Sequence, residues 1–150
     1  MSLCTPSSSE GAMVVEAAFQ KFPAVFVSLK GRNGAIRECV ALVDPCAEYC
    51  VVPKVDAYAL GYPEAANDDP VTPQDNTLTF ASFDGYGKAA LIEMAEVMLG
   101  GMSFRRVDFV AFDLPQVTRF DVVIGRSLLK STKLEIDYLA GRLRIGGAGS

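Results

Sequence analysis

Carboxylates are the side chains best able to do chemistry in this chain, whose 150 residues include 18 Asp and Glu but no His. The lack of His excludes Ser-His-Asp and Cys-His catalysis and the common zinc sites with His ligands. Asp44 has the most unusual position of the carboxylates, because it follows the continuous apolar run of residues 40–43. Burying a lone carboxylate is costly unless it is paired or neutral. Asp44 is therefore a candidate catalytic acid or base; an Asp that starts a turn before Pro45 is the alternative when this segment is taken alone.

A second segment repeats the pattern of the first. Residues 40–60 and 121–131 both read as an apolar strand, a polar break and a short helix. In the second segment Asp121 precedes the apolar residues and Gly125 follows them, whereas Asp44 comes after its apolar run. The chain therefore places a single Asp, not a pair, at the point where a buried strand ends.

The elements that position these segments are mostly short strands. Strands are predicted over residues 22–29, 36–43, 49–52, 77–83, 88–99, 103–113, 121–125, 133–138 and 142–145, and short helices over 54–60 and 126–130. Turn signals rich in Gly, Asn, Asp and Pro separate them. Short strands at this spacing imply an all-β sandwich or barrel with one or two short helices.

Both segments, and the order of the elements between them, resemble the retropepsins, the single-lobed aspartic proteases of retroviruses, and their cellular relatives. That family shows two apolar residues, Asp-Thr/Ser-Gly-Ala, a hairpin flap, two apolar residues, Gly-Arg-Asn/Asp, an apolar residue and Leu, and then a closing hairpin. The present chain follows this order over residues 22–146. The resemblance implies a closed barrel or sandwich of the acid-protease type in residues 13–150. The Ser-rich residues 1–12 are predicted to be a disordered tail.

The resemblance also implies a homodimeric aspartic endopeptidase that cuts extended peptides. Asp44 would be the catalytic residue, and the Asp44 carboxylates of two subunits would meet at the dimer axis. Two like charges so close do not both ionise easily, so the pair holds one proton. The ionised member would act as general base on a water, and the protonated member would polarise the scissile carbonyl. One chain supplies only one such Asp, so a second copy is required.

The resemblance assigns two further roles. A flap that covers the substrate is expected around the turn before the long strand, although an ordinary Asp-Gly hairpin is the alternative. The flap residues expected here are Phe83, Asp84, Gly85, Tyr86 and Gly87. The family also pairs an acid four residues after the catalytic Asp with the Arg of Gly-Arg-Asn/Asp. We therefore expect an ion pair between Glu48 and Arg126 that, together with Gly125, clamps the two turns to each other; solvated charges are the alternative.

The active-site turn departs from the family, because Asp44 is followed by Pro45, Cys46 and Ala47 in place of Thr/Ser, Gly and Ala. In the family the Thr or Ser hydroxyl and N–H form hydrogen bonds across the dimer that hold the two turns rigid, and Pro45 has neither group. Cys46 adds a side chain where the family has Gly. The alternative function is therefore a catalytically degenerate dimer that binds a peptide or serves as a scaffold.

Composition limits which partners, cofactors and cellular compartment are expected. The net charge of −4 and the lack of a Lys/Arg stripe argue against a nucleic-acid partner, and no apolar run is long enough to span a membrane. The four cysteines, with no secretory signal before them, are expected to be free thiols of a cytoplasmic protein. Neither a cofactor nor a metal is expected. A last alternative is an unrelated β-barrel, such as a small-ligand or redox protein that uses Cys46 and Cys50.

Overall fold

The computed structural model describes residues 5–9, 12–66, 77–82, 85–114 and 120–147. The strands are β1 (Thr5–Ser9), β2 (Ala12–Ala18), β3 (Ala24–Lys30), β4 (Ile36–Val43), β5 (Cys50–Val52), β6 (Thr77–Ser82), β7 (Gly85–Leu99), β8 (Met102–Ala111), β9 (Val122–Ile124), β10 (Lys133–Asp137) and β11 (Arg142–Gly146). The helices are α1 (Lys54–Ala59), α2 (Arg126–Leu129) and the short 3₁₀ helix η1 (Pro63–Ala66). Within these described residues, the helices are too short and too polar for any of them to cross a bilayer.

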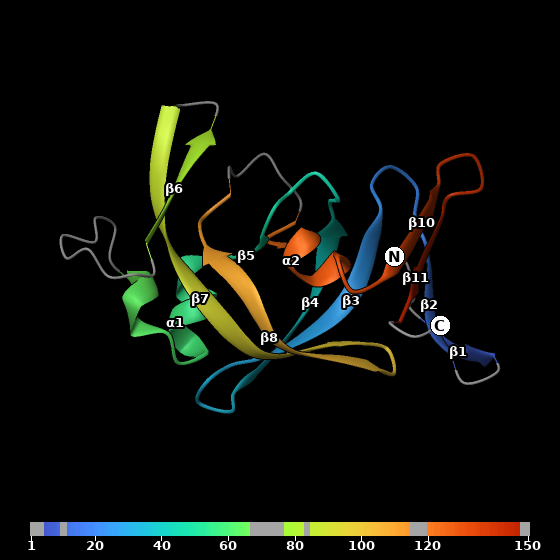
Figure 1. The fold of residues 1–150 in the computed structure, drawn as a ribbon, viewed down its shortest axis with the longest axis horizontal. Helices are drawn as coiled ribbons and strands as arrows, with labels where there is room; N and C mark the ends of the chain where they lie inside the picture. Colours follow the sequence, from blue (N-terminus) through green and yellow to red (C-terminus); the bar gives the residue numbers. More distant parts are fainter. Residues whose placement is uncertain (1–4, 10–11, 67–76, 83–84, 115–119, 148–150) are drawn as a thin grey trace.

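A closed barrel forms the larger part of the fold (Figure 1). Its strands are hydrogen-bonded in the order β3-β4-β9-β5-β8-β7, and a further pairing of β3 with β7 joins the two ends of that series. β6 stays outside the closed ring and pairs with β7 as a hairpin. The all-β barrel with short helices that the sequence predicts is therefore confirmed.

The position of β9 between β4 and β5 determines where the candidate turn lies. β4 runs parallel to β9, with Val43 opposite Ile124, and β5 runs antiparallel to β9 on its other side. The chain therefore leaves β4 at Asp44, passes over the end of β9 and returns as β5. This crossing brings residues 44–49 beside Gly125, although the two segments are far apart in sequence.

A smaller sheet stands beside the barrel and carries both ends of the chain, in the strand order β1-β2-β11-β10 (Figure 1). Part of the segment expected to be a disordered tail belongs to it, because Thr5–Ser9 pair with β2 from Thr5 opposite Glu16 to Ser9 opposite Ala12. The backbone N–H and C=O groups at the edge of β2 can pair with any extended residues, Ser and Thr included. The Ser-rich composition did not reveal this pairing.

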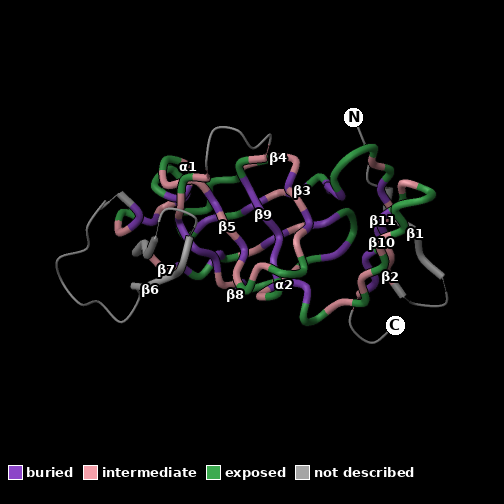
Figure 2. The backbone as a smooth tube through the Cα atoms, turned by 90° about the horizontal axis from the view of Figure 1, so that it is seen from above, coloured by how far each residue is buried: buried purple, intermediate pink, exposed green. Residues whose placement is uncertain are grey.

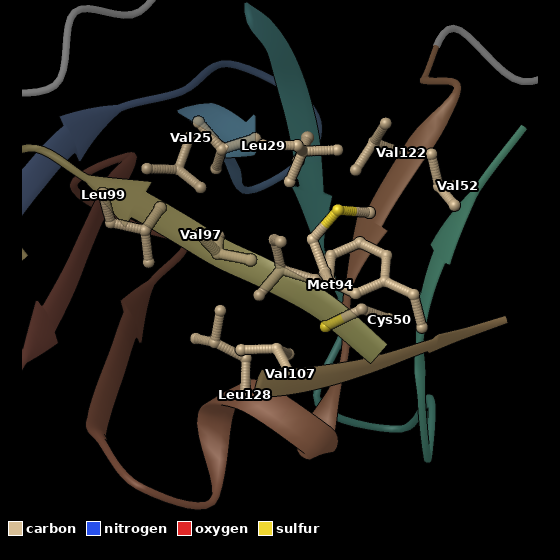
Figure 3. Close-up of a cluster of buried hydrophobic side chains, with 14 of the residues drawn as sticks. Val25, Leu29, Cys50, Val52, Met94, Val97, Leu99, Val107, Val122 and Leu128 are labelled. Atoms are coloured by element: carbon tan, nitrogen blue, oxygen red, sulfur yellow. The ribbon is translucent and has the colours of Figure 1, made fainter. Parts of the chain in front are cut away.

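Buried apolar side chains fill the barrel, and the buried stretches of the tube in Figure 2 follow its strands. Residues from different strands and from α2 meet in one cluster, shown in Figure 3: Val25, Leu29, Cys50, Val52, Met94, Val97, Leu99, Val107, Val122 and Leu128. Among the residues with described side chains, none of the buried ones is charged. The carboxylate of Asp44, which is half-buried, therefore lies at the edge of this core and not inside it.

Candidate active site

The turn that carries Asp44 is braced by its own hydrogen bonds. The backbone N–H of Asp44 donates to Ile124 O at 3.0 Å, and the N–H of Ala47 donates back to Asp44 O at 3.2 Å. The N–H of Cys46 donates to the Oδ1 atom of Asp44 at 2.9 Å. Asp side chains commonly stabilise turns in this way. The carboxylate is thus held in one orientation at the end of β4.

Backbone hydrogen bonds join this turn to the one that follows β9. The N–H of Arg126 donates to Ala47 O at 2.8 Å, and the N–H of Ser127 donates to Glu48 O at 3.0 Å. Gly125 permits the close approach, since a Cβ at that position would lie 2.4 Å from Tyr49 O and 2.8 Å from Ala47 O. A glycine is therefore required here by space and not by its φ angle.

The predicted ion pair between Glu48 and Arg126 is wrong for the chain as described: both side chains are exposed, and no salt bridge joins them. The backbone already connects the two turns through the carbonyl of Glu48. An exposed ion pair adds little free energy to such a contact, because water screens the charges and the side chains lose entropy. The two turns are therefore clamped by main-chain atoms.

Cys50 and Ser127 form a partly buried polar junction that the sequence did not reveal. The Cys50 N–H donates to Ser127 Oγ at 3.0 Å, and Ser127 Oγ donates to Asp108 O at 2.7 Å. The Gly125 N–H donates to the Cys50 sulfur at 3.3 Å. The available signal was the polar Ser127, which stands between Gly125-Arg126 and a pair of leucines. Its hydrogen-bond partners lie on other strands, whose positions cannot be predicted from residue spacing.

The cysteines of the site have opposite surroundings. Burial raises the pKa of the Cys50 thiol, with hydrogen bonds from Ser127 and Gly125 acting in the other direction. A raised pKa keeps the thiol protonated and a poor nucleophile. Cys46 is exposed beside Pro45, which is also exposed, and both cysteines are free. Cys50 is therefore a packing residue, whereas Cys46 is open to solvent next to the carboxylate.

The expected flap residues fall partly on the described chain. Phe83 and Asp84 lie outside the described residues. Gly85, Tyr86 and Gly87 begin β7 and pair with the end of β6, with Gly85 opposite Ser82. The β6–β7 hairpin projects beyond the barrel (Figure 1). In the part of the chain that the structure describes, no group of three or more Cys, Asp or Glu side chains is arranged to hold a metal.

Comparison with known proteins gives a match at the level of structure. No family model matches the sequence, and no curated protein matches it. The fold is similar to that in the crystal structure of a retropepsin-like aspartic protease from Rickettsia conorii, with a TM-score of 0.63 and 19% sequence identity. The match covers 96% of this chain and 98% of that one. Such a likeness at low identity concerns the fold, and it spans nearly the whole chain: this protein has the retropepsin-like fold.

Proposed function

We propose that this chain is one half of an aspartic endopeptidase that is completed when two copies pair. The observation that supports this most is the setting of Asp44. Its carboxylate is half-exposed at the end of a buried strand and is oriented by the Cys46 N–H. No other hydrogen bond to this carboxylate comes from the described residues, and an ionised carboxylate can accept several. Room therefore remains for a water and for a second carboxyl group.

In the proposed dimer the twofold axis passes between the two Asp44 side chains. One chain has only one acid at this position, so symmetry must supply the other. Two carboxyl groups in hydrogen-bonding distance share one proton, since both cannot ionise easily. The ionised group takes a proton from water, which attacks the peptide carbonyl, while the protonated group donates to the carbonyl oxygen.

The proposed substrate is a peptide in extended conformation. An extended strand can exchange backbone hydrogen bonds with an exposed hairpin, and the β6–β7 hairpin offers such an edge beyond the barrel (Figure 1). A hairpin that closes over the substrate also excludes water from the reacting atoms. The free thiols of Cys39, Cys46 and Cys50 favour a reducing compartment, such as the cytoplasm, as the place of action.

The turn also supports a second candidate, a dimer that holds a peptide without cutting it. Pro45 is exposed beside the carboxylate and has no N–H to donate to a partner subunit. A turn that is not held rigidly across the dimer positions its carboxylate less well, and a displacement of about 1 Å can cost on the order of a hundredfold in rate. This candidate keeps the fold, the dimer and the peptide but loses hydrolysis.

The experiment that separates the two candidates measures both cleavage and binding with one peptide library. For the endopeptidase, Asp44→Asn should lower kcat/KM at least about a hundredfold, the lower end of the usual contribution of a general acid or base. Asp121→Asn, which changes an exposed acid before β9, is the matched control and should cleave normally. Pepstatin-type inhibitors should stop the wild type. If the wild type cleaves nothing, and the Asp44→Asn variant binds peptides as tightly as the wild type does, the protein would instead be the binding module.

A further inference from the structure

A polar pocket of about 310 Å³ lies between β8 and α2. Its lining includes Arg105 and Arg106 from β8, and Lys130 and Ser131 directly after α2. None of residues 44–48 lines it. The two elements are held together by the hydrogen bond from Ser127 Oγ to Asp108 O, at 2.7 Å. The two segments that carry the charged side chains are therefore fixed relative to each other.

The backbone of β8 brings two consecutive arginines to this pocket. Successive residues of a regular strand point to opposite faces, yet Arg105 and Arg106 are both exposed and both line the pocket. The pairing with β7 passes from Val107 opposite Met94 to Arg105 opposite Glu96, so Arg106 is skipped. Arg106 has a φ of 56°, the only positive φ of a non-glycine residue within the described ranges. This conformation is unfavourable for a residue with a Cβ, and such outliers gather at binding sites.

The charge in the pocket is mostly unbalanced. Within this lining Arg105, Arg106 and Lys130 meet one carboxylate, that of Asp108, and Glu93 lies with the two arginines along a neighbouring pocket. Arg105 also has Glu96 nearby, at 3.9 Å, and this is too far for a hydrogen bond. Arg106 and Lys130 form no ion pair with any described residue. In a chain with a net charge of −4, this concentration of cations creates a local field that attracts anions.

We propose that this pocket binds a phosphoryl group. A guanidinium presents its N–H groups as a planar fork that matches the oxygens of a phosphate, and the two arginines, Lys130 and Asp108 together carry a formal charge of +2, which balances a dianion. The hydroxyl of Ser131 at the rim provides a further donor. The group comes either from free inorganic phosphate or from a phosphorylated residue of a peptide. Ser127 lies in the pocket lining and bonds to Glu48 O, so an occupied pocket adjoins the Asp44 turn.

The test follows backbone amide chemical shifts of the full chain during titration with inorganic phosphate at pH 8 and constant ionic strength, with chloride as the reference anion. A phosphoserine peptide and its unphosphorylated form are titrated in parallel. Arg106→Gly is the informative variant, because glycine accepts the positive φ, so the side chain with its guanidinium is removed without backbone strain. Arg142→Gln, which removes an exposed cation of β11, is the matched control. Thermal unfolding checks that both variants are folded.

We expect saturable shifts at residues 103–108 and 127–131 with phosphate or the phosphopeptide, and none with chloride or the unphosphorylated peptide. The tighter of the two phosphoryl ligands identifies the source. Arg106→Gly should weaken binding roughly tenfold or more, as loss of a charge-assisted hydrogen bond does, and Arg142→Gln should not. Shifts that fail to saturate, shifts that chloride reproduces, or equal affinity in Arg106→Gly would each overturn the proposal. None of these readouts depends on peptide cleavage.

Discussion

The backbone N–H of Cys50 donates a 3.0 Å hydrogen bond to the hydroxyl of Ser127, and this bond links the strand that follows the Asp44 turn to the helix that follows β9. The same hydroxyl donates to Asp108 O, so one side chain ties three segments of the barrel together. The position of the candidate catalytic turn therefore depends on a residue that takes no part in the proposed chemistry.

Ser127→Ala should destabilise the protein, because it leaves the Cys50 N–H and the Asp108 carbonyl without this partner in a partly buried site. The expected loss in the free energy of unfolding is about 1–3 kcal/mol, the usual cost of an unsatisfied buried polar group. Urea denaturation measures it. Ser131→Ala removes an exposed hydroxyl nearby and should change stability by less than about 0.5 kcal/mol. Equal effects of the two changes would show that the junction is unimportant.

Gly125→Ala should force the two turns apart. The added Cβ would lie 2.4 Å from Tyr49 O, and neither backbone segment can move without breaking hydrogen bonds. Overpacking of this kind costs about 1–3 kcal/mol. Gly34→Ala is a useful comparison, since Gly34 has open space around it and a φ of 85°. An alanine there would be destabilising through its backbone conformation alone, without a steric clash. If Gly125→Ala unfolds at the same urea concentration as the wild type, the close packing of the turns is not needed.

The sequence predicted well the elements that a local pattern of residue types marks. β4 spans Ile36–Val43, the range predicted for it, and α1 begins at Lys54, directly after Pro53. Proline has no N–H for the hydrogen bonds of a strand, so the extended segment ends before Pro53, and a continuous apolar stretch such as residues 40–43 is typical of a buried strand. The beginning of β7 was missed, because Gly85 and Gly87 are turn residues by type but pair with β6 in the structure.

The contacts that hold the site together could not be predicted from the types of its residues. The two turns meet where the ion pair between Glu48 and Arg126 was expected, but main-chain atoms make the contact. Because residues of almost every type can form main-chain hydrogen bonds, the partners depend on how the strands cross and not on the residue types. The order β4-β9-β5 places Asp44 beside Gly125, and no local spacing contains that order.

Restoring the family triplet should strengthen the proposed enzyme. The double variant Pro45→Thr, Cys46→Gly supplies the hydroxyl and N–H that Pro45 lacks and removes the side chain of Cys46. We expect tighter dimerisation and a kcat/KM raised about tenfold or more, because better placement of a catalytic group has effects of this size. Analytical ultracentrifugation and peptide cleavage measure the two quantities. Addition of Asp44→Asn to the variant is the control, and it should abolish the gain in rate.

The cysteines should differ sharply in reactivity toward iodoacetamide at pH 7.5. Of the three cysteines in the described ranges, Cys46 is the exposed one and should be modified before Cys39 and Cys50. Burial raises the pKa of Cys39 to about 11, with the nearby Arg37 acting in the other direction, and burial also raises the pKa of Cys50. Both thiols are therefore protonated at this pH and slow to react. Peptide mapping by mass spectrometry reads each site, and denaturation in urea should make all of them reactive. Rapid labelling of Cys50 in the native protein would show that the barrel opens there.

Whether two copies share one active site can be seen from the distance between their Asp44 carboxyl groups in a crystal of the purified protein. Sedimentation equilibrium should first show a dimer in solution. In the proposed dimer the closest oxygens of the two groups should lie about 2.5–3.2 Å apart across a twofold axis, near enough to share a proton. A strictly monomeric protein, or a dimer whose Asp44 carboxyl groups lie more than about 6 Å apart, beyond strong mutual influence, would contradict it.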